Sequence, residues 1–100
     1  MAEEKRINTI AGYEILPDNY TVDSDGHLWN RLTNREIGNR PDNKGYLTVT
    51  LPNCKRVRIH RIVALAFVDG YEPGLTVDHI NGDKTDNRVE NLQWLSNADN

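Results

Sequence analysis

Four side chains in the last quarter of the sequence combine a carboxylate, an imidazole and two amides at fixed spacings. Asp78 and His79 are adjacent. Asn91 lies 12 positions beyond the histidine, and Asn100 lies 21 positions beyond it. A neutral imidazole can take a proton from water near neutral pH, and carboxylate and amide oxygens suit Mg²⁺ or Mn²⁺ better than zinc. Residues of these types could therefore activate water beside a divalent cation.

Two other metal sites are excluded by spacing. An EF-hand loop counted from Asp78 needs oxygen ligands at its third and fifth positions and glycine at its sixth. Those positions hold Ile80, Gly82 and Asp83. A zinc site with the usual four nitrogen and sulfur ligands fails as well, because no cysteine lies near the motif and the other two histidines are remote in sequence.

The composition restricts the class of protein. The chain has 100 residues, 37% of them hydrophobic, and a mean hydropathy of −0.71, which excludes a large multidomain enzyme. Its single cysteine, Cys54, excludes an internal disulfide. The longest apolar run, residues 62–68, is far shorter than the roughly 20 residues of a membrane span, and the first residues lack a signal-peptide core. We expect an intracellular protein that does not associate with membranes.

The charge is segregated along the chain, although the formal net charge is only −3. Residues 1–30 carry a net −4, residues 31–61 carry +6, and residues 62–100 carry −5. A polyanion meets the local field rather than the average, so the basic middle is the informative part. The basic middle is interpreted either as a solvated face or as a surface for nucleic acid.

A hairpin is predicted within the basic middle, from residues 46–51 and 55–60 joined by a turn at 52–54. Alternation places apolar side chains on one face and hydroxyl or basic side chains on the other. Such a polar face suits phosphates and base edges, and a two-stranded ribbon fits the major groove of DNA. The candidate DNA-binding residues in and around the hairpin are Arg40, Lys44, Tyr46, Thr48, Thr50, Lys55, Arg56, Arg58 and Arg61.

The remaining patterns predict short elements around these segments. Alternation on both sides of the turn 24–26 predicts a hairpin over residues 20–32. The apolar stretch 60–68 predicts a short buried helix, with His60 as a structural, hydrogen-bonding residue at its start. Residues 75–80 and 92–95 predict two strands, and Ser96 is a good helix N-cap. The loop between these strands contains three residues interpreted as turn formers, Asp83, Asp86 and Asn87.

The sequence VDHINGDKTDNRVENLQW at residues 77–94 resembles the motif of the HNH nucleases, specifically the small phage and intron-encoded homing endonucleases with a ββα-metal site. Four upstream blocks resemble the N-terminal module that is often fused to this motif. They are GYE at 12–14, YTVDSDG at 20–26, GYLTV at 45–49 and HRIVALAF at 60–67. The resemblance covers about residues 12–100.

The resemblance implies roles for the four residues of the last quarter. His79 matches the general base of the family, and Asn91 matches the residue that braces the loop and orients the histidine. Asp78 and Asn100 match the ligands of one Mg²⁺ or Mn²⁺ ion per site. Because successive side chains of a strand point to opposite faces, Asp78 and His79 can serve one site only if the strand ends or twists at Asp78.

The implied fold class is α+β, with small antiparallel β hairpins and a short helix followed by a ββα-metal (HNH) unit. We expect a flexible lead-in at residues 1–11, an N-terminal β module at 12–52 and the HNH nuclease unit at 53–100. Since the chain ends at Asn100, we expect the last helix to be truncated after its first turn.

These features predict a metal-dependent DNA endonuclease, phage-encoded or in the cytoplasm of a bacterial host, that hydrolyses phosphodiester bonds of double-stranded DNA and cuts or nicks one strand. The alternative is a DNA-binding module or regulator that keeps the HNH fold with little or no cleavage. A weaker alternative is an interaction protein without a role on DNA. The DNA target and the oligomeric state stay open.

Overall fold

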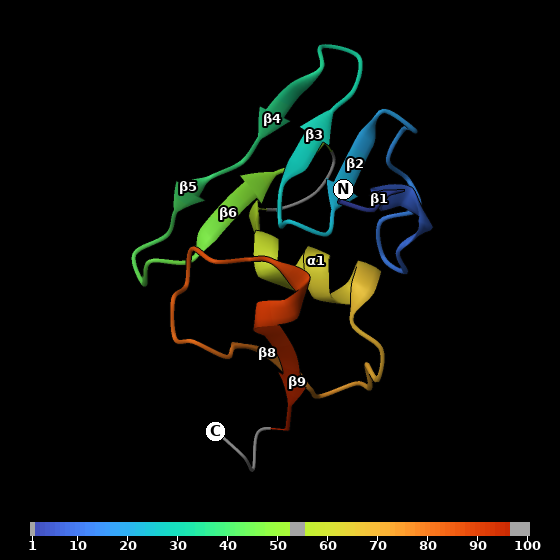
Figure 1. Cartoon of the computed structure of the whole chain (residues 1–100). Coiled ribbons are helices and arrows are strands. Elements are labelled where there is room, and N and C mark those ends of the chain that lie inside the picture. The colour runs from blue at the N-terminus through green and yellow to red at the C-terminus, as the bar shows by residue number, and fades with distance from the viewer. Residues whose placement is uncertain (1, 53–55, 97–100) are drawn as a thin grey trace.

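The first sheet has four antiparallel strands that follow one another in sequence order (Figure 1). The computed structural model describes residues 2–52 and 56–96. A short 3-10 helix, η1 (Ile7–Thr9), directly follows the first strand. The four strands are β1 (Glu4–Arg6), β2 (Tyr20–Asp23), β3 (Leu28–Asn30) and β4 (Arg35–Ile37).

The second sheet leads directly into the helix. Its strands are β5 (Arg40–Pro41), β6 (Leu47–Thr50) and β7 (Arg56–Arg58), with β6 in the middle. The helix α1 (Ile59–Phe67) begins at the residue after β7. The sequence predicted both this hairpin and a buried helix at 60–68, and both predictions are confirmed.

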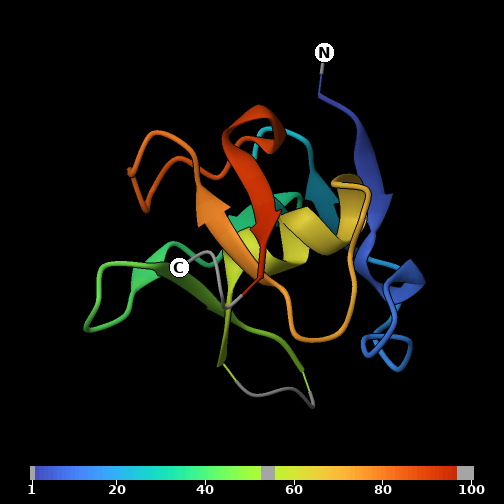
Figure 2. The same cartoon turned by 90° about the horizontal axis from the view of Figure 1, so that it is seen from below.

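The last part of the described chain is a two-stranded ribbon made of β8 (Thr76–His79) and β9 (Leu92–Leu95). A short 3-10 helix, η2 (Val89–Asn91), leads into β9. The strands pair antiparallel, with Asp78 opposite Gln93 and His79 opposite Leu92. The helix α1 lies between the two sheets and this ribbon (Figure 1), and the view from below shows the ribbon lying across the helix (Figure 2). The structure is thus α+β, with antiparallel sheets and one α-helix in the described residues.

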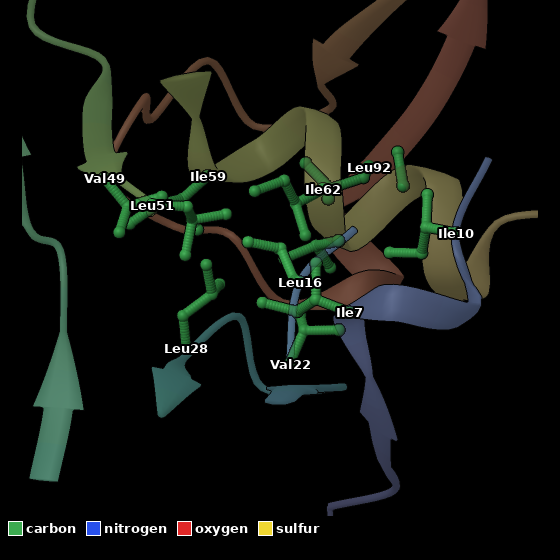
Figure 3. Packing of buried hydrophobic residues seen from close by; sticks show 12 residues of the cluster. Ile7, Ile10, Leu16, Val22, Leu28, Val49, Leu51, Ile59, Ile62 and Leu92 are labelled. Atoms are coloured by element: carbon green, nitrogen blue, oxygen red, sulfur yellow. The ribbon is translucent and has the colours of Figure 1, made fainter. Parts of the chain in front are cut away.

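One hydrophobic core connects these elements (Figure 3). The helix α1 provides Ile59, Ile62, Val63 and Ala64, all at most 1% exposed. Val22 and Leu28 reach this core from the first sheet, and Val49 from the second. Leu92 contributes from the ribbon. The core contains residues from both sides of position 52. The division into units at 12–52 and 53–100 stays a prediction.

The first eleven residues, for which the sequence predicted a flexible lead-in, contain a strand and a 3-10 helix in their described part. The strand β1 pairs antiparallel with β2, so that Glu4 lies opposite Asp23 and Arg6 opposite Thr21. Ile7 is fully buried, and Ile10 is 6% exposed. The polar residues of β1 occupy an exposed sheet edge, while the two isoleucines close one end of the core. In the described part of the chain, no helix has the length and apolarity needed to cross a bilayer.

Candidate active site

His79 is held by a hydrogen bond to the loop between β8 and β9. Its ring is buried at 7% exposure, and Nε2 lies 2.7 Å from Oδ1 of Asn87, which is 4% exposed. An amide oxygen only accepts hydrogen bonds, so Nε2 donates in this contact, and in the neutral imidazole the lone pair is then on Nδ1. This tautomer is the one that can accept a proton at Nδ1.

Asp78, the neighbour of His79, is half-buried and is fixed across the ribbon. Its Oδ2 accepts a hydrogen bond of 3.0 Å from Nε2 of Gln93, its register partner on β9. Its other oxygen, Oδ1, makes no hydrogen bond with a described residue. One hard carboxylate oxygen of Asp78 is therefore unused by the part of the protein that the structure describes.

Asp78 and His79 line one cavity of about 180 Å³ together with Tyr46, Gly82 and Lys84. The sequence predicted that the two could meet only if the strand ended or twisted at Asp78. The strand β8 continues through His79, and both residues nevertheless line the cavity. Two-stranded ribbons twist more strongly than wide sheets, which allows neighbouring side chains to share a site.

A larger cavity of about 470 Å³ adjoins the first one. The two cavities share Tyr46, Val77 and Asp78 in their linings. The larger one is also lined by two arginines, Arg58 and Arg61. The site therefore opens onto a surface with positive charge.

Three aromatic rings stack beneath the site. The ring of Tyr46 lies 5.1 Å from that of His60, which in turn lies 4.9 Å from that of His79 at an interplanar angle of 17°. Arg58 lies 4.0 Å above the Tyr46 ring and Lys84 lies 4.8 Å from it. The stack thus limits how the imidazole of His79 can turn.

His60 was expected to be a hydrogen-bonding residue, and the structure shows a stacking one. Its side chain makes ring contacts and no hydrogen bond with a described residue. Burial lowers the pKa of His60 to about 4, and the electrostatic effects of the neighbouring His79 and Arg58 act in the same direction. His60 is therefore neutral at pH 7 and adds no charge beside His79.

Asn91 braces the loop that follows β8. Its side chain is 5% exposed, and its Nδ2 donates to Oδ1 of Asn81 at 3.0 Å and to the carbonyl oxygen of Asp86 at 2.8 Å. Its Oδ1 accepts from the backbone N–H of Asn81 at 3.0 Å. The side chain in hydrogen-bond contact with His79 is that of Asn87. The role predicted for Asn91 in orienting the histidine stays a prediction.

The carboxylates of this loop bond within the loop itself. The hydrogen bond from Arg88 holds the pKa of Asp86 well below its usual range. The hydrogen bonds from Thr85 likewise lower the pKa of Asp83. Both residues were predicted as turn formers, and their contacts agree with that interpretation.

The candidate DNA-binding residues occupy different surroundings. Tyr46, Arg58 and Arg61 line the larger cavity beside the site. Arg40 and Thr50 line a separate groove of about 450 Å³ between the two sheets. Lys44 is exposed, and Arg56 donates to the carbonyl oxygen of Pro41 at 3.1 Å. Lys55 lies outside the described residues.

Thr48 departs from the prediction of an exposed polar face. It is 4% exposed, donates to the carbonyl oxygen of Arg40 at 2.6 Å and accepts from Nε of Arg56 at 2.7 Å. The prediction assumed a ribbon of two strands, but β6 is the middle strand of three. The neighbours of Thr48 therefore cover its side chain and use its hydroxyl.

The residues present fit a divalent cation in their donor chemistry. Asp78 has one carboxylate oxygen without a hydrogen bond to a described residue and borders the smaller cavity, and Mg²⁺ sites commonly use one or two carboxylates and keep several waters. Within residues 2–52 and 56–96, no group of three or more His, Cys, Asp or Glu side chains could hold a metal. Asn100, the predicted second ligand, lies outside that part.

Sequence reasoning missed three side chains that contact the site residues. Asn87 contacts His79 from eight positions away, and Gln93 contacts Asp78 from 15 positions away. His60 reaches the site from the start of α1. The only available signal was the predicted pairing of the strands at 75–80 and 92–95, which places Gln93 near Asp78 without fixing the register.

Comparison with known proteins identifies the family. Residues 57–100 match the family described as HNH endonuclease. Uncharacterized HNH endonuclease L247 of Acanthamoeba polyphaga mimivirus is 38% identical over 97 residues, which cover 91% of this chain and 23% of that protein. DNA endonuclease I-HmuI of Bacillus phage SP01 is 33% identical over 90 residues, covering 87% of this chain and 50% of that protein.

A solved structure shows the same fold. It is described as DNA binding and cleavage by the HNH homing endonuclease I-HmuI, and it aligns with a TM-score of 0.81 and 30% identity over 96% of this chain and 53% of that one. Residues 57–100 thus belong to the HNH endonuclease family, whose members typically use a divalent metal. The chain as a whole is related to the homing endonuclease I-HmuI and to viral HNH endonucleases. It spans half or less of the length of these curated relatives.

Proposed function

We propose that the chain hydrolyses phosphodiester bonds of double-stranded DNA and nicks one strand at the cavity shared by Asp78 and His79. The observation that carries the proposal is the pairing of a hydrogen-bonded imidazole and a half-used carboxylate on one cavity, beside two arginines. The relation to I-HmuI, which is named a DNA endonuclease, supports DNA as the substrate.

His79 is the general base in this proposal. Asn87 holds the proton on Nε2, so Nδ1 can take a proton from the attacking water. Proton transfer to a positioned side chain contributes on the order of 10²–10⁴ in rate. The stack with His60 and the hydrogen bond to Asn87 keep the ring in one orientation, which reduces the entropy that would otherwise be lost on reaching the reactive geometry.

Asp78 would hold the divalent cation, Mg²⁺ or Mn²⁺, and Asn100 is its proposed second ligand. When bound, the ion neutralises charge on the phosphate and on the departing 3′ oxygen. Gln93 occupies one oxygen of Asp78 and so directs the other toward this use. The carboxylate is thereby kept in place across the ribbon without a second acidic side chain next to it.

The positive residues beside the site would hold the DNA backbone. Arg58 and Arg61 line the larger cavity, and Lys84 lines the smaller one. Ammonium and guanidinium donors of this kind neutralise phosphates and fix the register of a duplex without reading sequence. The proposed contacts further along the second sheet are Arg40, Lys44, Thr50, Lys55 and Arg56.

Nicking of a supercoiled plasmid tests the proposal. We expect open-circular product with Mg²⁺ or Mn²⁺, and its loss in EDTA and in the variant Asp78→Asn. The exposed carboxylate Asp69 offers a matched control, and Asp69→Asn should cleave like the parent chain. Cleavage that continues undiminished in EDTA would contradict the mechanism. Salt-sensitive duplex binding without cleavage would instead support a DNA-binding module.

A further inference from the structure

The turn between β2 and β3 touches the loop that holds the candidate base. The backbone N–H of Val89 donates to the carbonyl oxygen of Ser24 at 3.0 Å. Gly26 in the same turn is buried and lies directly against Asn87. A methyl group at position 26 would lie 2.5 Å from the carbonyl oxygen of Asn87 and 2.7 Å from its Cβ. The two segments are about sixty residues apart in sequence and are in van der Waals contact.

Asn87 depends on its backbone for its position. Its side chain bonds to Nε2 of His79 and makes no other hydrogen bond with a described residue. No hydrogen bond from a described residue therefore holds this amide from its other side. The backbone of Asn87 is bordered by Gly26, and Val89, two residues later, is bonded to Ser24.

We propose that the turn 24–26 is a positioning element of the active site, acting on His79 through Asn87, with Gly26 as the positioning residue. The first sheet then supports the catalytic geometry in addition to the fold. The inference rests on the proposed function, because it takes His79 as the base. It explains why position 26 holds glycine on two grounds, since its φ of +92° is unfavourable for other residues and no side chain fits against Asn87.

A matched pair of glycine substitutions separates the effect of backbone strain from the effect of the contact with Asn87. Gly12 has φ of +97° and nothing within 4 Å of the position of an added Cβ, whereas Gly26 has φ of +92° and the contact with Asn87. Gly12→Ala and Gly26→Ala carry the same kind of backbone strain. Only Gly26→Ala displaces Asn87, so a difference between the two variants reports the contact.

The experiment measures three quantities on the full chain. They are the single-turnover rate of plasmid nicking, the affinity for duplex DNA, and the ¹⁵N NMR signals of the His79 imidazole, which distinguish the Nε2–H tautomer from the Nδ1–H tautomer. We expect Gly26→Ala to lower the rate at least about tenfold, as small misplacements of catalytic groups do. We also expect it to leave duplex affinity within about twofold and to shift the tautomer signals. Gly12→Ala should change none of the three.

A second variant covers the case in which Gly26→Ala does not fold. Val89 is the first residue of η2, and the preceding Arg88 has φ −60° and ψ 142°, the conformation that proline requires before it. Proline is also favoured at a first helical position. Val89→Pro therefore removes the N–H that bonds Ser24, and its ring Cδ, which takes the place of that hydrogen, pushes the Ser24 carbonyl oxygen away. We expect the same changes in the rate and the tautomer signals.

The outcomes distinguish this inference from the proposed function. If the parent chain cleaves and depends on His79, but Gly26→Ala and Val89→Pro cleave like Gly12→Ala with unchanged imidazole signals, the positioning role is refuted and the proposed function stands. If His79 is dispensable for cleavage, the proposed function fails. The imidazole signals still report in that case whether the turn holds the ring.

Discussion

The two hairpins that meet at the candidate active site, β2–β3 and β8–β9, each place a buried polar side chain that stabilises their connection. In β2–β3, Asp23 accepts from the backbone N–H groups of residues 25 and 27 at 3.0 Å and from Nε1 of Trp29 at 2.9 Å. In β8–β9, Asn91 makes three hydrogen bonds that close the longer loop 80–91. Both side chains are at most 7% exposed, and both stabilise a connection.

The two hairpins differ in how far the polar atoms of their side chains are used in hydrogen bonds with described residues. Both oxygens of Asp23 accept hydrogen bonds from its own hairpin. On β8, the side chains of Asp78 and His79 each make one hydrogen bond with a described residue, and both line a cavity. A buried polar group that is fully bonded stabilises the fold, whereas a half-bonded one on a cavity can meet a ligand. The comparison indicates which polar residues of this chain are structural and which are available for chemistry.

The largest expected effect on stability comes from removing the two buried side chains that stabilise the hairpin connections. Asp23→Ala and Asn91→Ala each delete three hydrogen bonds at buried positions, which should lower the free energy of unfolding by about 2–4 kcal/mol. Urea unfolding measures both values. A loss below about 1 kcal/mol in either variant would contradict the assignment of that side chain as the support of its connection.

The double variant tests whether the hairpins are independent. Because Ser24 bonds to Val89 and Gly26 lies against Asn87, the two losses should not add. Contacting sites typically show interaction energies of about 0.5–3 kcal/mol. Additivity to within about 0.3 kcal/mol would mean that the turn and the loop are not coupled.

A smaller effect is expected from pH. Burial lowers the pKa of His60 from 6.5 to about 4. Between these two pH values, His60 is protonated in the unfolded chain and neutral in the folded chain. Stability is therefore fully present above about pH 6.5 and falls as the pH drops toward 4, by on the order of 2 kcal/mol. His60→Phe keeps a ring in the stack and should flatten this dependence.

The control for His60 is a histidine on the surface. His27 is exposed and lies in the β2–β3 connection, so His27→Gln should leave the pH dependence of unfolding in place. Thermal unfolding across the pH range compares the three proteins. Parallel curves for His60→Phe and the parent chain would show that burial of this imidazole does not govern acid stability.

The smallest effect concerns DNA binding. Arg61 lines the cavity beside the site, whereas Arg31 pairs with Glu4 on the first sheet and lies over the ring of Trp29. Arg61→Ala should reduce the slope of log affinity against log salt by about one, as expected for one lost phosphate contact. Arg31→Ala should leave the slope unchanged. Fluorescence anisotropy with a labelled duplex measures it, and equal slopes would argue against the proposed surface.

The elements that could be predicted from the sequence are those with a local pattern. Alternation and turn residues indicated β2–β3 and β6–β7, and the apolar stretch indicated α1. The strands β1, β4 and β5 have three residues or fewer and exist through pairing with β2, β3 and β6. The partner of β1 lies well along the chain, and β4 and β5 are too short for alternation to show although their partners are close in sequence, so these elements were missed.

The residues of the candidate site also divide into those with a local sequence signal and those without one. Asp78 and His79 could be found because they are adjacent residues of a segment that resembles the HNH motif. Asn87 and Gln93 could not be assigned, since their contacts depend on the path of the loop and on strand register. His60 reaches the site because α1 packs against β8, which is a property of the tertiary structure.

The single-turnover rate of plasmid nicking by His79→Ala tests the central claim most directly. The exposed His27 again provides the matched control, as His27→Ala. We predict that His79→Ala loses on the order of 10²–10⁴ in rate with Mg²⁺ while duplex affinity and His27→Ala stay at parent values. Cleavage by His79→Ala at the parent rate would contradict the claim that this imidazole is the base.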